Sequence, residues 1–193
     1  MQMPILDILN NGMKSNISVA GSVPIKWDFD ESNRIGAVIG SGNVYKDKNF
    51  AYATANTEAH LQDMLNSKIY KNTRILVPED LYKKYIFFEQ VDCLPNFPAM
   101  KSLDIDEETC SEQLLSLMLA CWMEVDNIYL FGYDIQNLTE RSRLISIAIC
   151  YPHSNIIYVR NPNPSKIFLF DTYDNMSVMD YIQFQELVDK HGK

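Results

Sequence analysis

Polar residues that directly follow short apolar runs are the best candidates for chemistry in this sequence. They are Gly40-Ser41-Gly42-Asn43, Asn56 and Gly132-Tyr133-Asp134. If the apolar runs are parallel strands, these residues lie at the carboxyl ends of the strands, where open α/β sheets bind their ligands. We therefore treat them as candidate ligand contacts.

Each of these positions has a functional and a simpler explanation. Residues 40–43 either cradle a phosphate with backbone N–H groups or form an ordinary strand-to-loop turn. Asn56 either hydrogen-bonds a ribose or base edge or caps the next helix, and its place at a strand end favours the first. Asp134 either accepts ribose hydroxyls or holds a divalent ion such as Mg²⁺, or it begins an Asx turn. Gly132 permits close approach of a ligand, which favours a functional role for Asp134.

Two further positions have stronger structural explanations. Ser111 stands at a predicted helix N-terminus, where it could face a ligand, but Thr109 and Glu112 match a capping box and already explain this sequence. His60 follows closely after Asn56 and has the position of a general base, although an ordinary surface histidine is the simpler interpretation.

The elements that position these residues alternate between strands and helices. The predicted strands cover residues 35–39, 50–55, 74–77, 128–131, 155–159 and 166–170. The predicted helices begin at Thr57, Pro78, Thr109, Thr139 and Ser177, the last together with Asp180. This alternation indicates a Rossmann-like three-layer α/β sandwich, in which helices flank a mostly parallel sheet.

We expect a single Rossmann-like domain over residues 1–193. Residues 34–193 form its α/β core, whereas residues 1–33 are interpreted as an N-terminal arm or decoration. The helix before residues 128–131 is apolar from residue 114 to 123 except at Ser116. This run is too short to span a membrane, so we expect the helix to be buried against the sheet.

Composition limits the classes of function. The net charge of -8 argues against a general nucleic-acid-binding protein, which needs a basic face to neutralise phosphates. It leaves room for one small nucleotide, which a few backbone N–H groups can bind. The first residues lack the basic segment and long apolar core of a signal peptide, and we expect a cytoplasmic protein.

The sequence gives no reason to expect a protein-bound zinc ion. Its four cysteines lack CxxC spacing and are interpreted as thiols of a reducing compartment, and its three histidines show no metal-ligand spacing. Asp171 and Asp174 follow the predicted strand over residues 166–170. We interpret them as turn residues rather than as carboxylates added to a site at Asp134.

Three of these segments, taken in order, resemble the bacterial CMP-sialic-acid-dependent sialyltransferases and the related 6-hydroxymethylpterin diphosphokinase-like proteins. Residues 38–43 are similar to a family strand and its Gly-x-Gly-Pro-Ser turn, although Asn43 and Val44 replace the Pro and Ser. Residues 50–56 are similar to the family's second strand, which ends in a nucleotide-binding Asn. Residues 111–134 are similar to a helix that begins Thr-Ser-Gly and leads into Ile-Tyr-Leu-x-Gly-x-Asp, but they lack the Gly of the helix start.

The resemblance implies a nucleotide or nucleotide-sugar ligand, bound by Gly40, Ser41, Gly42, Asn43, Asn56, Ser111, Gly132 and Asp134. The family's catalytic histidine lies on a lid between the Gly-x-Asp strand and the next helix. Here the helix predicted at Thr139 follows Asp134 too closely for such a lid. No catalytic residue is therefore assigned.

Three functions remain open. The first is a nucleotide-sugar-dependent glycosyltransferase or a degenerate relative, which we favour on the strand-end residues and the resemblance. The second is a diphosphokinase-like enzyme with Mg²⁺ near Asp134. The third is a non-enzymatic binding or interaction module that kept the fold, which the missing lid and scarce histidines favour.

Overall fold

The computed structural model describes residues 16–21, 35–41, 50–67, 72–103, 110–133, 137–160 and 170–191. The strands within these ranges are β1 (Asn16–Ala20), β2 (Ala37–Ser41), β3 (Tyr52–Thr54), β4 (Arg74–Val77), β5 (Val91–Cys93), β6 (Asn127–Phe131), β7 (Asn155–Arg160) and β8 (Met176–Asp180). The helices are α2 (Glu58–Asn66), α3 (Glu79–Tyr85), α4 (Pro98–Ser102), α5 (Glu112–Trp122), α6 (Leu138–Cys150) and α7 (Tyr181–His191), with a short 3-10 helix, η4 (Phe170–Thr172).

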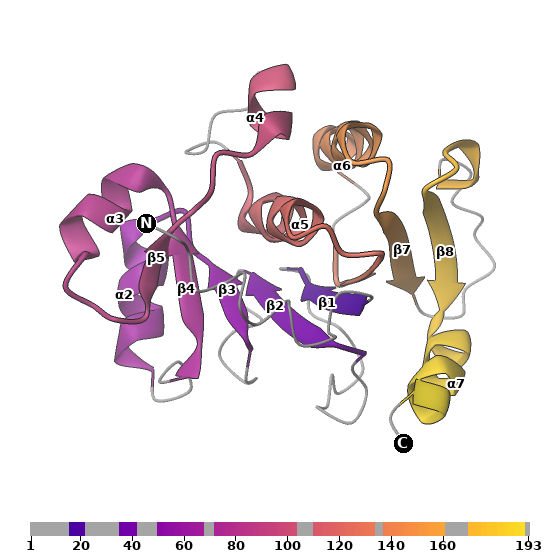
Figure 1. The fold of residues 1–193 in the computed structure, drawn as a ribbon, viewed down its shortest axis with the longest axis horizontal. Coiled ribbons are helices and arrows are strands. Elements are labelled where there is room, and N and C mark those ends of the chain that lie inside the picture. The colour runs from indigo at the N-terminus through magenta and orange to yellow at the C-terminus, as the bar shows by residue number, and fades with distance from the viewer. Residues whose placement is uncertain are drawn as a thin grey trace.

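The eight strands form one parallel sheet in the order β5-β4-β3-β2-β1-β6-β7-β8. The chain builds the sheet outward from β1 to β5, and α5 then carries it back to β6 on the other side of β1 (Figure 1). The direction of strand order therefore changes between β1 and β6. This is the place where open α/β sheets form a crevice at the carboxyl ends of their strands.

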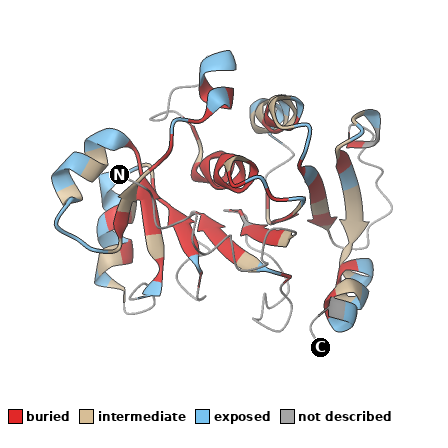
Figure 2. Cartoon of the chain, viewed as in Figure 1, coloured by how far each residue is buried: buried red, intermediate tan, exposed pale blue. Residues whose placement is uncertain are grey.

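Strand side chains alternate between two hydrophobic cores, one on each face of the sheet. In β6, Ile128 and Leu130 belong to the core under α5 and α6, whereas Tyr129 and Phe131 belong to the core on the opposite face. Alternation with a period of two is the geometry of a strand covered on both faces. The buried residues of Figure 2 accordingly fill the middle of the sheet and α5.

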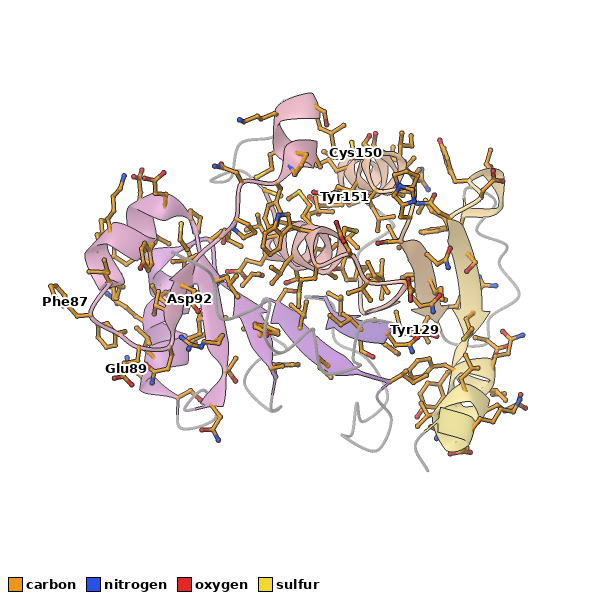
Figure 3. The ribbon with its side chains drawn as sticks, in the orientation of Figure 1. Phe87, Glu89, Asp92, Tyr129, Cys150 and Tyr151 are labelled. Carbon is orange, nitrogen blue, oxygen red and sulfur yellow. The ribbon has the colours of Figure 1, made fainter. Side chains whose placement is uncertain are left out.

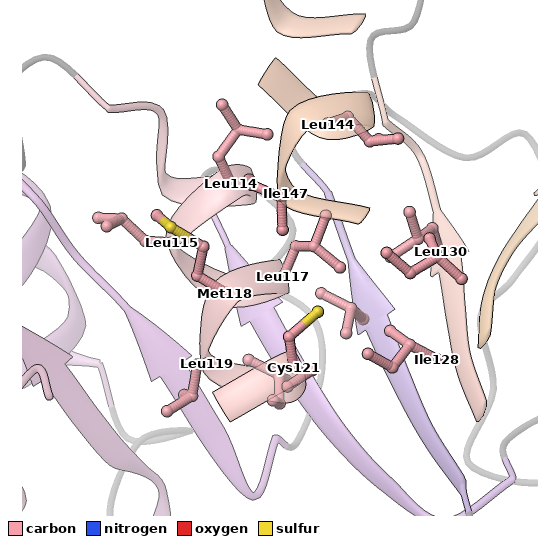
Figure 4. Packing of buried hydrophobic residues seen from close by; sticks show 14 of the residues in the cluster. Leu114, Leu115, Leu117, Met118, Leu119, Cys121, Ile128, Leu130, Leu144 and Ile147 are labelled. Carbon is pink, nitrogen blue, oxygen red and sulfur yellow. The ribbon is translucent and has the colours of Figure 1, made fainter. Parts of the chain in front are cut away.

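Helix α5 is the most deeply buried helix of the described chain. Every residue from Glu112 to Cys121 is buried, because α5 packs on β1, β2 and β3 and also contacts α6. In the close view of Figure 4, Leu117 and Cys121 lie beside Ile128 of β6, and Leu114 lies near Ile147 of α6. A helix that is apolar on most of its surface needs such cover on all sides.

Helices α2, α3 and α7 cover the opposite face. Leu61 of α2 and Phe184 of α7 are fully buried there. The ring of Phe184 meets Tyr129 and Phe131 edge-on, with centroids 5.2 Å and 4.9 Å away. Figure 3 shows Tyr129 on the side of the sheet that faces α7. The three-layer α/β prediction is therefore confirmed.

Strands β1, β5 and β8 differ from the sequence-based predictions. Residues 16–20 were placed in an arm or decoration, but they form β1 at the centre of the sheet. β5 was not predicted. Residues 177–180 were predicted to begin a helix but belong to β8, and Phe170, predicted as strand, lies in η4. The remainder of the strand predicted over residues 166–170 lies outside the described residues.

Helix starts also differ in detail. Thr57 caps α2 as predicted, with its side chain accepting a hydrogen bond from the N–H of His60. Helix α6 begins at Leu138, and the side chain of Asn137 caps it. Helix α7 begins after Asp180, whose side chain forms a reciprocal capping box with Gln183.

Candidate functional site at the carboxyl edge of the sheet

Two glycines meet where the direction of strand order changes. Gly21 follows β1 and donates its N–H to the carbonyl oxygen of Phe131 at 2.6 Å. A Cβ atom on Gly21 would lie only 2.5 Å from the carbonyl oxygen of Gly132, and Gly132 itself has a φ of 63°. The Gly132 carbonyl group and the ring of Tyr133 fill this place, so a side chain on Gly21 would clash, and one on Gly132 would be strained. The two glycines therefore permit close packing of the segments that follow β1 and β6.

Gly40 and Ser41 lie in β2 rather than in the predicted turn. Gly40 is paired with Ala20 of β1 and Ala53 of β3, in the interior of the sheet. A Cβ atom at Gly40 would lie 2.6 Å from the ring of Phe50, so packing explains this glycine. Ser41 is fully buried. Gly42 and Asn43, the other two residues of the predicted phosphate cradle, lie outside the described residues.

Asn56 ties the end of β3 to the start of α5. Its backbone N–H donates to Oε1 of Glu112 at 3.1 Å, and its side-chain Nδ2 donates to the carbonyl oxygen of Cys110 at 2.8 Å. One of the two N–H groups of the side-chain amide is thus bonded to the protein. The amide oxygen has no hydrogen-bond partner within the described residues, so it can accept one from a ligand.

His60 and Glu112 form the closest titratable pair of this edge. Nδ1 of His60 lies 2.7 Å from Oε1 of Glu112. The carboxylate side chain is 6% exposed, whereas the imidazole is 42% exposed. Because a carboxylate accepts hydrogen bonds, Nδ1 carries the proton, and the lone pair of the neutral ring is on Nε2.

The buried hydroxyl groups of Thr54 and Ser116 connect the start of α5 to the sheet. The hydroxyl of Thr54, at the end of β3, donates to the carbonyl oxygen of Glu112 at 2.9 Å and lies 2.7 Å from the hydroxyl of Ser116. The Ser116 hydroxyl in turn lies 3.3 Å from the carbonyl oxygen of Gly40. These bonds join β2 and β3 to the first turn of α5. The position of Glu112 is therefore fixed by the sheet as well as by its own helix.

A second carboxylate, Glu140 of α6, lies on the other side of the α5 start. Its Oε2 accepts from the Ser111 hydroxyl at 2.5 Å and from Nε2 of Gln113 at 2.9 Å, and its Oε1 lies 3.7 Å from the guanidinium of Arg143. The Tyr133 hydroxyl donates to the carbonyl oxygen of Gln113 at 2.5 Å. Burial raises the pKa of Tyr133 well above its usual value, and the charge of Glu140 adds to this effect.

The structure changes the explanation of the α5 start. Helix α5 begins after Ser111, so Glu112 is its first residue and does not occupy the third position of a capping box. The predicted capping box is wrong, since the carboxylate of Glu112 is bonded to Asn56 and His60. Ser111 makes no capping bond with its side chain, which points to Glu140 instead. Thr109 lies outside the described residues.

Of the aspartates considered in the sequence, Asp174 is the one whose side chain the structure describes. Asp134 lies outside the described residues. Asp174 is exposed in the turn before β8, at the amino end of that strand. The carboxylate of Asp174 is therefore at the opposite edge of the sheet from residues that end β3 and β6, because all strands run parallel. Nothing is described of the Asp171 side chain.

Gly21 was not among the predicted site residues, and the contact between His60 and Glu112 was not predicted. Gly21 directly follows the alternating segment over residues 16–20, and a glycine after a short strand is a signal of close backbone approach. The partnership of His60 with Glu112 had no local signal, because the two residues are 52 positions apart.

Within the described ranges, no group of three His, Cys, Asp or Glu side chains is arranged to hold a metal ion. Among the described helices, none combines the length and apolar character needed to cross a membrane.

Comparisons with known proteins place the chain by its fold. No family model and no curated protein matches the sequence. Among solved structures, it is similar to the sialyltransferase CstII from Campylobacter jejuni, determined in complex with a substrate analogue, cytidine-5'-monophosphate. The two chains share 15% sequence identity with a TM-score of 0.51, over 80% of this chain and 82% of the other. The chain therefore has a fold like that of a sialyltransferase, as the resemblance predicted.

Proposed function

We propose that this protein is a nucleotide-sugar-dependent glycosyltransferase-like protein that binds its nucleotide at the carboxyl ends of the sheet strands. One observation carries the proposal. Asn56, His60 and Glu112 form a connected polar group at that edge, in a fold similar to that of a sialyltransferase solved with a nucleotide. Open parallel sheets bind ligands at this edge.

The contacts suggest how a nucleotide would lie. The N-terminus of α5 would be an anion site, but the carboxylate of Glu112 already occupies its first turn. A phosphate would therefore be repelled there, and it is proposed to lie instead at the ends of β1 and β6, where the direction of strand order changes. The amide oxygen of Asn56 then accepts a hydrogen bond from a ribose hydroxyl or an exocyclic amine of the base. Asp134 is proposed as a second ribose contact.

The lid of the family has no counterpart between β6 and α6. Only residues 132–137 separate the two elements, and Asn137 already caps α6. Transfer by the family's lid histidine is therefore not part of the proposal. A proton acceptor would have to come from another element of the same edge.

Ligand-observed NMR with CMP, CDP, UDP, GDP, ATP and their sugar conjugates tests the proposal. The wild type is expected to bind one nucleotide selectively, and Asn56→Ala is expected to weaken that binding about tenfold, as for loss of one specific hydrogen bond. Asn155→Ala is the matched control, because Asn155 is an exposed residue at the amino end of β7. Absence of binding to every panel member at millimolar concentration would sink the proposal and favour an interaction module. Binding of ATP alone, dependent on Mg²⁺, would favour the diphosphokinase alternative.

A further inference from the structure

We propose that His60, oriented by Glu112, is the general base at the carboxyl edge of the sheet. It accepts the proton from the hydroxyl group of the acceptor molecule. The inference rests on the proposed function, because it assigns a proton acceptor to the same nucleotide-sugar site. His60 belongs to α2, whereas the catalytic histidine of the sialyltransferases lies on a lid between the strand and helix that correspond to β6 and α6.

Glu112 holds the imidazole in one orientation and one tautomer. Its Oε1 lies 2.7 Å from Nδ1 of His60 and also accepts from the N–H of Asn56, so the carboxylate cannot rotate freely. The carboxylate is almost fully buried and sits in the first turn of α5, where the helix dipole stabilises a negative charge. A carboxylate that fixes an imidazole in this way leaves Nε2 as the basic atom.

The pair is not needed to attach the two helices. Helix α2 is already capped by Thr57. The start of α5 is already held by Asn56 and by the Thr54 hydroxyl. A half-exposed imidazole would add little stability if it only joined α2 to α5, because solvent screens exposed pairs. The exposure of His60 suits a base that must receive a proton from a bound molecule and release it to water.

His60 also lies within reach of the proposed nucleotide position. It belongs to the first turn of α2, which follows β3 after residues 55–57. β3 is two strands away from β1, and neighbouring strands are about 4.8 Å apart, so the distance across the edge is about 10 Å. A nucleotide sugar with its phosphate at the ends of β1 and β6 can extend this far toward α2.

The step conserves atoms and charge. The acceptor oxygen forms a bond to the anomeric carbon of the donor sugar, while the bond between that carbon and the phosphate oxygen breaks. The electron pair of the broken bond leaves with the nucleotide phosphate, and the acceptor proton moves to Nε2 of His60. The carboxylate of Glu112 stabilises the resulting imidazolium. Water replaces the acceptor in hydrolysis, so the base can be tested before the acceptor is known.

Nucleotide release from CMP-sialic acid, UDP-glucose, UDP-N-acetylglucosamine and GDP-mannose in water is the test, made on the full chain. His60→Gln is expected to lower kcat for the best donor at least about 100-fold and to leave KM within about twofold. Glu112→Gln is expected to lower kcat about tenfold or more, because the orienting charge is lost. His153→Gln, at an exposed histidine in the turn before β7, is expected to leave both constants unchanged. Circular dichroism verifies that each variant is folded.

The outcomes separate the two proposals. Nucleotide binding that persists in His60→Gln with wild-type kcat would overturn the assignment of the base and leave the binding site intact. A rise in KM with unchanged kcat would show that His60 binds substrate instead, which also overturns the assignment. A wild type that binds a nucleotide but releases none from any donor would overturn the base and leave a binding module. A wild type that binds no nucleotide would overturn both. If Glu112→Gln does not fold, the half-exposed His60→Gln still decides the question.

Discussion

Two carboxylates flank the first turn of α5, and they are built differently. Glu140 accepts from Ser111 and Gln113 and pairs with Arg143, so its surroundings form a closed network. Glu112 accepts from the backbone of Asn56 and from His60, whose ring is 42% exposed. Both carboxylates are largely buried, but the network of Glu112 ends in the more exposed side chain, since His60 is 42% exposed and Arg143 is 29% exposed.

This difference indicates that the network around Glu140 stabilises the fold, whereas the network around Glu112 serves ligand chemistry. Buried polar groups must have partners, and Glu140 accepts two hydrogen bonds on Oε2 and forms an ion pair through Oε1, which suits a purely structural role. Glu112 directs its charge toward a titratable ring at the ligand-binding edge of the sheet. We therefore expect substitutions on the Glu140 side to affect stability and substitutions on the Glu112 side to affect ligand chemistry.

The largest effect on stability is expected from Glu140→Ala. It leaves the Ser111 hydroxyl and the nearly buried amide of Gln113 without their acceptor. Hydrogen bonds to charged groups contribute about 1.5–3 kcal/mol each, so the free energy of unfolding is expected to fall by about 3 kcal/mol. Urea denaturation followed by circular dichroism measures the change. A loss below about 1 kcal/mol would contradict the closed network.

Glu112→Ala is expected to destabilise less than Glu140→Ala. The N–H of Asn56 and Nδ1 of His60 lose their acceptor, but both groups are partly accessible to water. The expected loss in unfolding free energy is about 1.5 kcal/mol. If the same denaturation experiment gave a larger loss for Glu112→Ala than for Glu140→Ala, the comparison of the two carboxylates would be reversed.

Tyr133→Phe is expected to cost about 1 kcal/mol at neutral pH, because one hydrogen bond to the carbonyl oxygen of Gln113 is lost. The effect should become smaller in alkali. The folded pKa of Tyr133 is raised by burial, so the tyrosine ionises in the unfolded chain above about pH 10 while the folded chain keeps its proton.

The folded state therefore binds more protons than the unfolded state above that pH. The contribution of Tyr133 is complete below pH 10 and is lost at up to about 1.4 kcal/mol per pH unit as the pH rises toward the folded pKa. Denaturation at pH 7, 9, 10 and 11 should show a gap between wild type and Tyr133→Phe that narrows above pH 10. A gap that stays constant would show that Tyr133 titrates normally in the folded protein.

The smallest effect is expected from Ser116→Ala. The Thr54 hydroxyl keeps the carbonyl oxygen of Glu112 as its acceptor, and only the bonds of the Ser116 hydroxyl are lost. We expect a loss of about 0.5–1 kcal/mol and no change in nucleotide affinity. A change in nucleotide affinity above about threefold would indicate that the hydroxyl groups of Thr54 and Ser116 position Glu112 for ligand binding. Stability and ligand chemistry would then not be separate on this side of α5.

Strands made of short apolar runs were predicted from the sequence, whereas strands that mix polar and apolar residues were missed. β4 was predicted to the residue, because the apolar run Ile75-Leu76-Val77 follows Arg74 and is ended by Pro78. β1 was missed because it contains Ser18, a polar residue that is fully buried. Its hydroxyl donates to the carbonyl oxygen of Ile35 at 3.2 Å, a distant bond that local patterns do not reveal. β8 lies at the edge of the sheet and is only partly buried, so its apolar pattern is weak.

The candidate site shows the same limit. Asn56 was predicted from its place at a strand end, which is local information. The role of Glu112 was not predicted, because a carboxylate at a helix start has a simpler local explanation as a cap. Only the crossing of α5 over β3 brings Glu112 to Asn56 and His60, and that crossing depends on the topology of the whole sheet.

A crystal structure of the protein with the nucleotide that binds best tests the central claim most directly. We predict that the nucleotide lies at the carboxyl edge, with its phosphate at the ends of β1 and β6 and its ribose or base within hydrogen-bond distance of Asn56. A nucleotide found at the amino edge, or a protein that binds none of the nucleotides at millimolar concentration, would contradict the account.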